Sequence, residues 1–258
     1  MNAIRPSFGE NTSLEISVLA NFGNEIFGID QNTNAFVRFD IEPDRFPSVS
    51  FNPFALWKVR LSDEPGIRDP ARPELIGVTE IIPIGQVHSK SAIAQLSKEC
   101  SSPSAMPILG FNGPSISYGL ITGRSPSITV IELTKRQAIR KNSYGEITIS
   151  FPWSQIITSL PIGNQAERQL FEKVNRPLNT DGEIASVLGF KPKFMVVALA
   201  KPRGGYCRKV AVGLLPKKIS RKTAKVLKAR QLESAAAGIW PVQDTKATII
   251  SDLNDDTD

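Results

Sequence analysis

Apolar and polar residues alternate along much of the first two-thirds of the chain. A period of two predicts β-strands with one buried face and one solvated face. The alternation is clearest in five segments, residues 14–18, 36–41, 56–61, 127–133 and 146–151. A polar linker at 31–34 separates 25–30 from 35–41, which predicts a β-hairpin. The first two-thirds of the chain therefore reads as mostly strand.

Helical spacing is rarer. It occurs in residues 89–99, 165–174 and 181–188, and in a longer candidate at 220–237 that is followed by Gly238. Thr180 is a suitable N-cap for the third segment, and Gly189 is a suitable residue to end it. The elements together predict a strand-rich α+β fold, in which an antiparallel sheet or sandwich-like body carries a few short helices and a basic hairpin-plus-helix region at its C-terminal end.

The chain has 258 residues, which fits one large domain or two small ones. We predict a β-rich body over residues 1–160 and a basic α+β region over 161–250, which either packs with the body as one domain or stands apart. Residues 251–258 carry four aspartates and are expected to form a flexible acidic tail. No run approaches 18 apolar residues, the first residues lack the apolar stretch expected of a secretory signal, and two cysteines are too few for a disulfide scaffold. A cytoplasmic location is expected.

The chain has a net charge of +6, but its acidic and basic residues are unevenly distributed along the sequence. Residues 1–190 hold 17 Lys and Arg against 19 Asp and Glu, a balance of −2. Residues 191–230 hold 13 Lys and Arg and no acid, whereas residues 231–258 hold one Lys and six acids, so the balances are +13 and −5. Thirteen cations in forty residues without one acid is unlike the mixed-sign surface of most soluble proteins.

Residues 191–230, which we call the basic segment, also have a pattern that predicts secondary structure. Apolar runs at 194–200 and 209–215 flank Gly204-Gly205, a pair that favours a tight hairpin turn. The residues expected near its tip are Lys201, Arg203, Tyr206, Arg208 and Lys209, and those that follow are Lys217, Lys218, Arg221, Lys222, Lys225 and Lys228. On a helix, the last four would share an arc of roughly 120°. A basic ribbon tip beside a basic helix predicts contact with a phosphate backbone, and a solvated basic face without a partner is the alternative.

Two neighbouring patterns bear on this hypothesis. A smaller basic run, Lys135, Arg136, Arg140 and Lys141, either extends the same surface or forms a charged turn. Residues 178–190 resemble the first helix and turn of a helix-turn-helix motif, but the apolar run at 194–200 reads as a strand where a recognition helix would lie. Residues 181–188 are therefore predicted to be a short packing helix.

Candidates for catalysis are weak. Clustered carboxylates hold the metal ion of many nucleases, and the acids Asp63, Glu64, Asp69, Glu74 and Glu80 lie close together in the sequence. The usual nuclease spacing is absent, since Glu132 and Lys135 are separated by two residues rather than one. We interpret these acids as solvated turn residues and His88, the only histidine of the sequence, as a surface or cap-adjacent residue. The neighbouring cations predict a lowered pKa for the Cys207 thiol, but no base accompanies it. We therefore predict no catalytic residue, no metal site and no cofactor.

One stretch resembles a known family. Between Trp57 and Glu99, the segments Trp57-Lys58-Val59-Arg60-Leu61, Leu75-Ile76-Gly77-Val78, Pro83-Ile84-Gly85 and Ala94-Gln95-Leu96-Ser97-Lys98-Glu99 are similar to part of the matrix proteins of negative-strand RNA viruses. That resemblance implies a β-rich, basic, non-enzymatic protein that assembles on anionic membranes and contacts nucleocapsids.

The sequence thus predicts a non-catalytic protein that binds RNA or DNA within a larger assembly, together with other protein subunits or copies of itself. The alternative is a matrix-like structural protein that docks on an anionic membrane surface. A metal-dependent nuclease is the third class.

Overall fold

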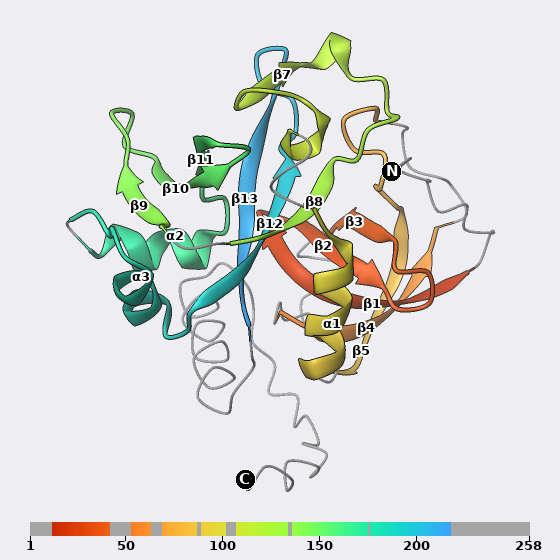
Figure 1. Ribbon diagram of the computed structural model, residues 1–258. Helices are drawn as coiled ribbons and strands as arrows, with labels where there is room; N and C mark the ends of the chain where they lie inside the picture. The colour runs from red at the N-terminus through yellow and green to blue at the C-terminus, as the bar shows by residue number, and fades with distance from the viewer. Residues whose placement is uncertain are drawn as a thin grey trace, which may run out of the picture.

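The structure is a computed structural model, and it describes residues 12–41, 53–62, 69–86, 89–101, 107–133, 136–174 and 176–217. These residues form three sheets and three α-helices, so the predicted strand-rich α+β class is confirmed. In Figure 1 a small sheet with two helices lies on the left, a central sheet runs through the middle, and a curled sheet lies on the right. The predicted helix at 220–237, the tail at 251–258 and His88 lie outside the described residues.

The curled sheet contains the first five strands, β1 (Ser13–Phe22), β2 (Glu25–Asp30), β3 (Phe36–Asp40), β4 (Ala55–Leu61) and β5 (Val78–Gln86). Its order is β3-β2-β1-β4-β5, and every pair is antiparallel. Arg38 on β3 also bridges to Leu75, just before β5, so the sheet bends into a half-barrel. The strands predicted at 14–18, 36–41 and 56–61 and the hairpin at 31–34 are confirmed.

The central sheet has the order β6-β8-β12-β13-β7. Its members are β6 (Cys100–Ser101), β7 (Ser115–Ser117), β8 (Ile128–Glu132), β12 (Pro192–Leu199) and β13 (Tyr206–Pro216). All its pairs are antiparallel except the short pair of β6 with β8. Strand β12 is buried on both faces, which explains its uninterrupted apolar sequence. Met195 faces one hydrophobic core and Phe194 faces another.

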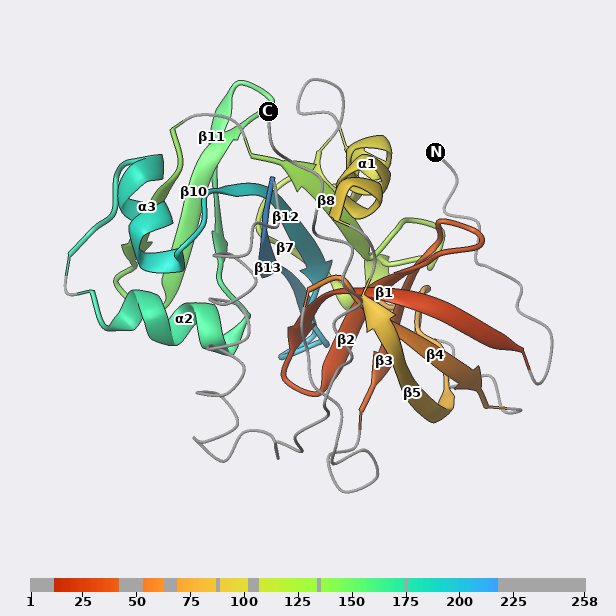
Figure 2. The same ribbon diagram turned by 90° about the horizontal axis from the view of Figure 1, so that it is seen from below.

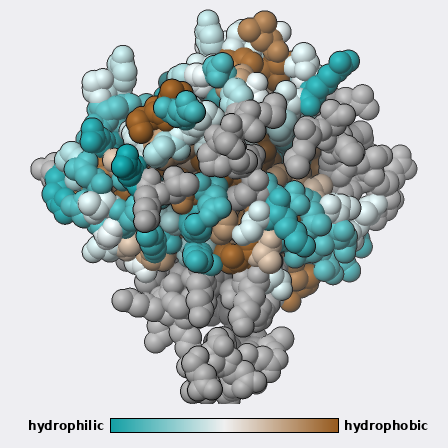
Figure 3. Space-filling view, in the orientation of Figure 1, coloured by the Kyte–Doolittle hydropathy of each residue, from teal (hydrophilic) through white to brown (hydrophobic). Residues whose placement is uncertain are grey.

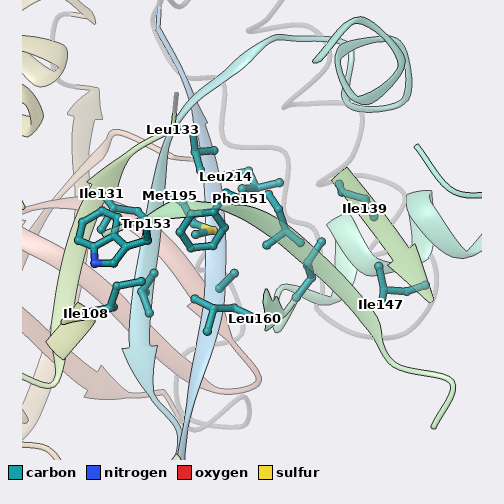
Figure 4. Close-up of a cluster of buried hydrophobic side chains, with 14 of the residues drawn as sticks. Ile108, Ile131, Leu133, Ile139, Ile147, Phe151, Trp153, Leu160, Met195 and Leu214 are labelled. Carbon is teal, nitrogen blue, oxygen red and sulfur yellow. The ribbon is translucent and has the colours of Figure 1, made fainter. Parts of the chain in front are cut away.

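The small sheet and two helices lie between β8 and β12 in the sequence. They are β9 (Ala138–Lys141), β10 (Ile147–Trp153), β11 (Ile156–Pro161), α2 (Gln165–Glu172) and α3 (Asp181–Leu188). Figure 2, seen from below, again places them on one side of β12 and β13, with the half-barrel on the other. Their apolar side chains meet the central sheet in a shared core, where Phe151 and Trp153 approach Met195 (Figure 4).

Helix α3 has the caps that its sequence predicts. The Thr180 side chain accepts a hydrogen bond from the Glu183 amide, and the Glu183 carboxylate accepts one from the Thr180 amide. The helix ends at Gly189, whose φ of 68° is left-handed. Strand β12 follows, so no second helix completes a helix-turn-helix, and the predicted short packing helix is confirmed.

On the other face of the central sheet, helix α1 (Ser89–Glu99) and strand β1 complete the second core. Ala92 and Leu96 of α1 are buried there, as the predicted helix at 89–99 requires. Strand β1 crosses so close to β13 that a Cβ added to Gly213 would lie 2.6 Å from the Cβ of Ala20. Glycine at this position therefore allows the half-barrel to pack directly on the central sheet.

A buried guanidinium also joins the half-barrel to the central sheet. Arg38 is fully buried, and its Nε and Nη2 donate to the two oxygens of Glu25 at 2.8 and 2.7 Å. Nη1 donates to Ser127 Oγ at 2.9 Å, next to the start of β8. Nη2 also donates to the carbonyl oxygen of Leu199, at the end of β12, at 2.9 Å. One side chain thus binds β2, the approach to β8 and the end of β12.

Two acids that we expected to be solvated belong to this network. Glu74 accepts hydrogen bonds from the amide and hydroxyl of Ser127. Burial raises the pKa of Glu74, although the Ser127 hydrogen bonds and the Arg38 charge oppose the rise. Burial also raises the pKa of Asp69, but hydrogen bonds from Arg72 and the Ala71 amide, with the Arg72 charge, outweigh that effect and lower it.

The interpretation of Asp69 and Glu74 as solvated turn acids is therefore wrong, because buried hydrogen-bond donors hold both carboxylates. Glu80 is exposed and lies 3.5 Å from Arg60, in line with the interpretation. Asp63 and Glu64 lie outside the described residues.

Replacing Arg38 with methionine should destabilise the protein by about 3–5 kcal/mol, because Glu25 would remain as a buried carboxylate without this bidentate partner. Urea-induced unfolding measures the free energy. The control is Arg60→Met, which removes an exposed pair and should cost no more than about 1 kcal/mol. Equal losses in the two variants would contradict the importance assigned to Arg38.

Candidate nucleic-acid interface

The predicted turn at Gly204-Gly205 is confirmed. Both glycines have positive φ, 57° and 80°, as a two-residue hairpin turn of this twist requires. Arg203 and Tyr206 flank the turn and exchange backbone hydrogen bonds of 2.9 and 3.2 Å. On the side of β7, the Tyr118 amide donates to the carbonyl oxygen of Gly205 at 2.8 Å. The tip of the β12–β13 hairpin is therefore held on both sides by backbone hydrogen bonds.

Carboxylates from distant parts of the chain pair with many cations of the acid-free segment. Lys201 Nζ lies 2.9 Å from Asp40, and Arg208 donates to both oxygens of Glu146 at 2.9 and 3.0 Å. The further pairs are Lys191 with Asp181 and Lys193 with Glu132. Within the described part of the chain, Arg203 is exposed and has no carboxylate in ion-pair distance.

Lys209 lies inside the protein. Its side chain is 4% exposed, and its Nζ donates to the carbonyl oxygen of Phe111 and lies 3.9 Å from the centre of the Phe111 ring. Burial lowers the pKa of Lys209 to about 8. The Lys209 ammonium is therefore bound to Phe111 and enclosed, whereas it was predicted to be exposed near the hairpin tip.

The Cys207 thiol was predicted to have a lowered pKa, and this prediction is wrong. Cys207 is a buried free cysteine, and burial raises its pKa. The charge of Asp69 raises it further, against the opposing charges of Arg38 and Arg72. Arg208, the neighbouring cation in the sequence, instead pairs with Glu146 at the surface.

The pair between Arg208 and Glu146 brings the β9–β10 turn next to the hairpin tip. Hydrogen bonding to Arg208 lowers the pKa of Glu146, with further donation from Asn142, so the pair stays charged. Asn142 Oδ1 also accepts from the amides of Tyr144 and Glu146 at 3.0 and 2.9 Å, which fixes the turn. Tyr144 projects from it with 88% of its surface exposed.

Sequence reasoning missed Tyr144. The available signal was an aromatic residue in the polar stretch Asn142-Ser143-Tyr144-Gly145, where nothing local would bury it. Lys141, from the smaller basic run, lies against this turn, because a Cβ at Gly145 would be 3.6 Å from its Cε. Arg140 donates to Asn179, Arg136 is exposed, and Lys135 lies outside the described residues.

We call the surface formed by these two turns the tip surface. Its members are Lys141, Tyr144, Lys201, Arg203, Tyr206 and Arg208. Four cations against the carboxylates of Asp40 and Glu146 give it a net charge of +4 − 2 = +2. The upper part of the face in Figure 3 mixes hydrophilic and hydrophobic side chains. Leu120, Ile156 and Ile157 are other exposed apolar residues of the described chain.

Lys217 does not lie at the tip surface. Strand β13 has 11 residues and runs from Tyr206 to Pro216, so Lys217 is about 36 Å from Tyr206 at about 3.3 Å per residue. The remaining predicted site residues, Lys218, Arg221, Lys222, Lys225 and Lys228, lie outside the described residues. The structure therefore brings together the tip cations, but not the tip and Lys217.

The described residues also bear on a metal-dependent or a membrane-spanning function. They contain no group of three or more His, Cys, Asp or Glu residues arranged to hold a metal ion. None of the helices among them is long and apolar enough to cross a membrane.

Replacing Lys209 with methionine should change how stability depends on pH. Lys209 loses its proton near pH 8 in the folded chain but near 10.4 when unfolded, so the unfolded state binds more protons between these values. Stability should therefore rise with pH in this window through Lys209, by at most about 1.4 kcal/mol per pH unit. Urea unfolding from pH 7 to 10 should show this rise in the wild type relative to Lys209→Met. Parallel pH profiles would contradict it.

Comparison with known proteins finds no match to this chain among protein-family models, curated proteins or solved structures.

Proposed function

We propose that the chain is a non-catalytic nucleic-acid-binding protein that acts within a larger assembly, and that the tip surface is one of its contacts. The observation that carries the proposal is the grouping of exposed cations with two exposed tyrosines on adjacent turns. Arg203 and Lys141 have no carboxylate partner among the described residues, so they are the cations of the tip surface most available to a phosphate.

The physical argument is electrostatic. Lysine and arginine side chains that contact phosphates release counterions from the nucleic acid, and this release supplies most of the sequence-independent affinity. The pairs Lys201–Asp40 and Arg208–Glu146 hold the two turns in place before binding, so less ordering entropy is lost on association. The basic run from Lys217 to Arg230, which carries seven Lys and Arg in the sequence, supplies further charge.

A second candidate function is supported by a different observation. Leu120, Ile156 and Ile157 are 71%, 65% and 68% exposed, and exposed apolar side chains together with basic residues are typical of proteins that dock on anionic membranes. This candidate corresponds to the matrix-like alternative. The net positive tip surface is common to both functions, so the binding experiment includes vesicles.

Replacing both Arg203 and Lys141 with alanine should weaken binding to a fluorescein-labelled oligonucleotide. Each lost phosphate contact should reduce the slope of log affinity against log salt by about 0.7 for a single strand and about 0.9 for a duplex. Folding should persist because both side chains are exposed. Fluorescence anisotropy at several salt concentrations measures both quantities.

The matched control is Lys58→Ala with Arg60→Ala, which removes two exposed cations from β4 in the half-barrel. This variant should keep the wild-type slope. A second variant, with Arg221, Lys222, Lys225 and Lys228 replaced by alanine, measures the share of the C-terminal run. The proposal is wrong if the wild type binds neither RNA nor DNA at low salt, or binds only vesicles that contain phosphatidylserine.

A further inference from the structure

We infer that the tip surface takes single-stranded nucleic acid and that unstacked bases lie against the rings of Tyr144 and Tyr206. This inference rests on the proposed function and specifies its ligand. It is carried by the exposure of the two rings, by the hydrogen-bonded turns on which they lie, and by the cations near each turn.

Both rings are open to solvent. Tyr144 and Tyr206 are 88% and 56% exposed, and neither stacks on another ring or on a cation in the described part of the chain. Tyr118, the third tyrosine, differs because it is partly buried and its hydroxyl donates to Asp69 at 3.2 Å. Exposed aromatic faces on a cationic surface are the platforms on which proteins stack the bases of single strands.

The turns fix where the two rings lie. Asn142 holds the backbone around Tyr144, and the two-residue turn at Gly204-Gly205 holds Tyr206. Tyr206 and Arg208 are two residues apart on β13, so both point to the same side at a separation of about 7 Å. Glu146 is likewise two residues from Tyr144. The ion pair of Arg208 with Glu146 therefore links the strand that carries Tyr206 to the turn that carries Tyr144.

Cations near the rings add possible phosphate contacts to the stacking surfaces. Arg203 pairs across the turn with Tyr206 through its backbone, and Lys141 lies against the turn that carries Tyr144. Each ring thus has a cation close to it that can contact the phosphate next to a stacked base. Arg208 and Lys201 keep their carboxylate partners, which neutralise their charges, so the net positive charge of the surface comes from Arg203 and Lys141.

A duplex suits this surface less well than a single strand. Bases within a duplex are already stacked and paired, so their faces are closed to the tyrosine rings. Reading a major groove usually requires an exposed helix, and the one motif that resembled a recognition unit continues as the buried strand β12 after α3. Because stacking tolerates any base, we expect little sequence preference.

The test uses the full chain with three fluorescein-labelled probes: a twelve-nucleotide oligo-dT single strand, the duplex of the same length, and inorganic polyphosphate, which carries charge but no bases. The variants are Tyr144→Leu, Tyr206→Leu and the double variant. Tyr144→Phe and Tyr206→Phe retain the ring, and Tyr118→Phe is the matched control. Circular dichroism checks that each variant is folded.

Each leucine variant should weaken single-strand binding at least about fivefold, since stacking is worth about 1–3 kcal/mol per base. Polyphosphate affinity and the salt slope should stay unchanged, because no cation is removed. The phenylalanine variants and Tyr118→Phe should bind like the wild type.

The outcomes separate this inference from the proposed function. Equal binding of single strand and duplex, with no loss in the leucine variants, would overturn the inference and leave nucleic-acid binding intact. A wild type that binds polyphosphate but no oligonucleotide, or that binds only phosphatidylserine vesicles, would overturn both.

Discussion

The buried guanidinium of Arg38 is the interaction on which the arrangement of the sheets depends. It binds Glu25 within the half-barrel, Ser127 at the approach to β8 and the Leu199 carbonyl at the end of β12. A buried charge without partners is costly, so these elements must come together in a single geometry. Glu74, which accepts from Ser127, extends the network to the segment that closes the half-barrel.

The same network fixes the end of β12 that leads into the hairpin turn. Leu199 is bound by Arg38, and two residues later Lys201 pairs with Asp40 on β3. Farther along, Arg208 pairs with Glu146 and draws the β9–β10 turn to the hairpin tip. The position of the tip surface therefore follows from contacts between elements on both sides of the central sheet, rather than from the hairpin alone.

The ion pairs made by the basic segment change how its charge should be interpreted. An acid-free segment suggests a uniformly positive face, but the fold supplies carboxylates to it from other elements and encloses Lys209 under Phe111. What remains at the tip is a modest positive charge with two exposed aromatic rings. Such a combination fits stacking supported by phosphate contacts better than a purely electrostatic grip, which needs many unpaired cations.

The sequence by itself determined the elements whose signals are local. The alternation of apolar and polar residues located several strands, Thr180 and Gly189 delimited α3, and Gly204-Gly205 specified the hairpin turn. Strands β9 and β11 were not predicted, because β9 has four residues and β11 begins with two adjacent exposed isoleucines that break the alternation. Only the tertiary structure decided which charges pair, since Lys201 and Asp40 are 161 residues apart and Arg208 and Glu146 are 62 apart. It likewise buried Lys209 and Cys207 and raised the thiol pKa, because burial depends on what packs against a strand and not on its neighbours in the sequence.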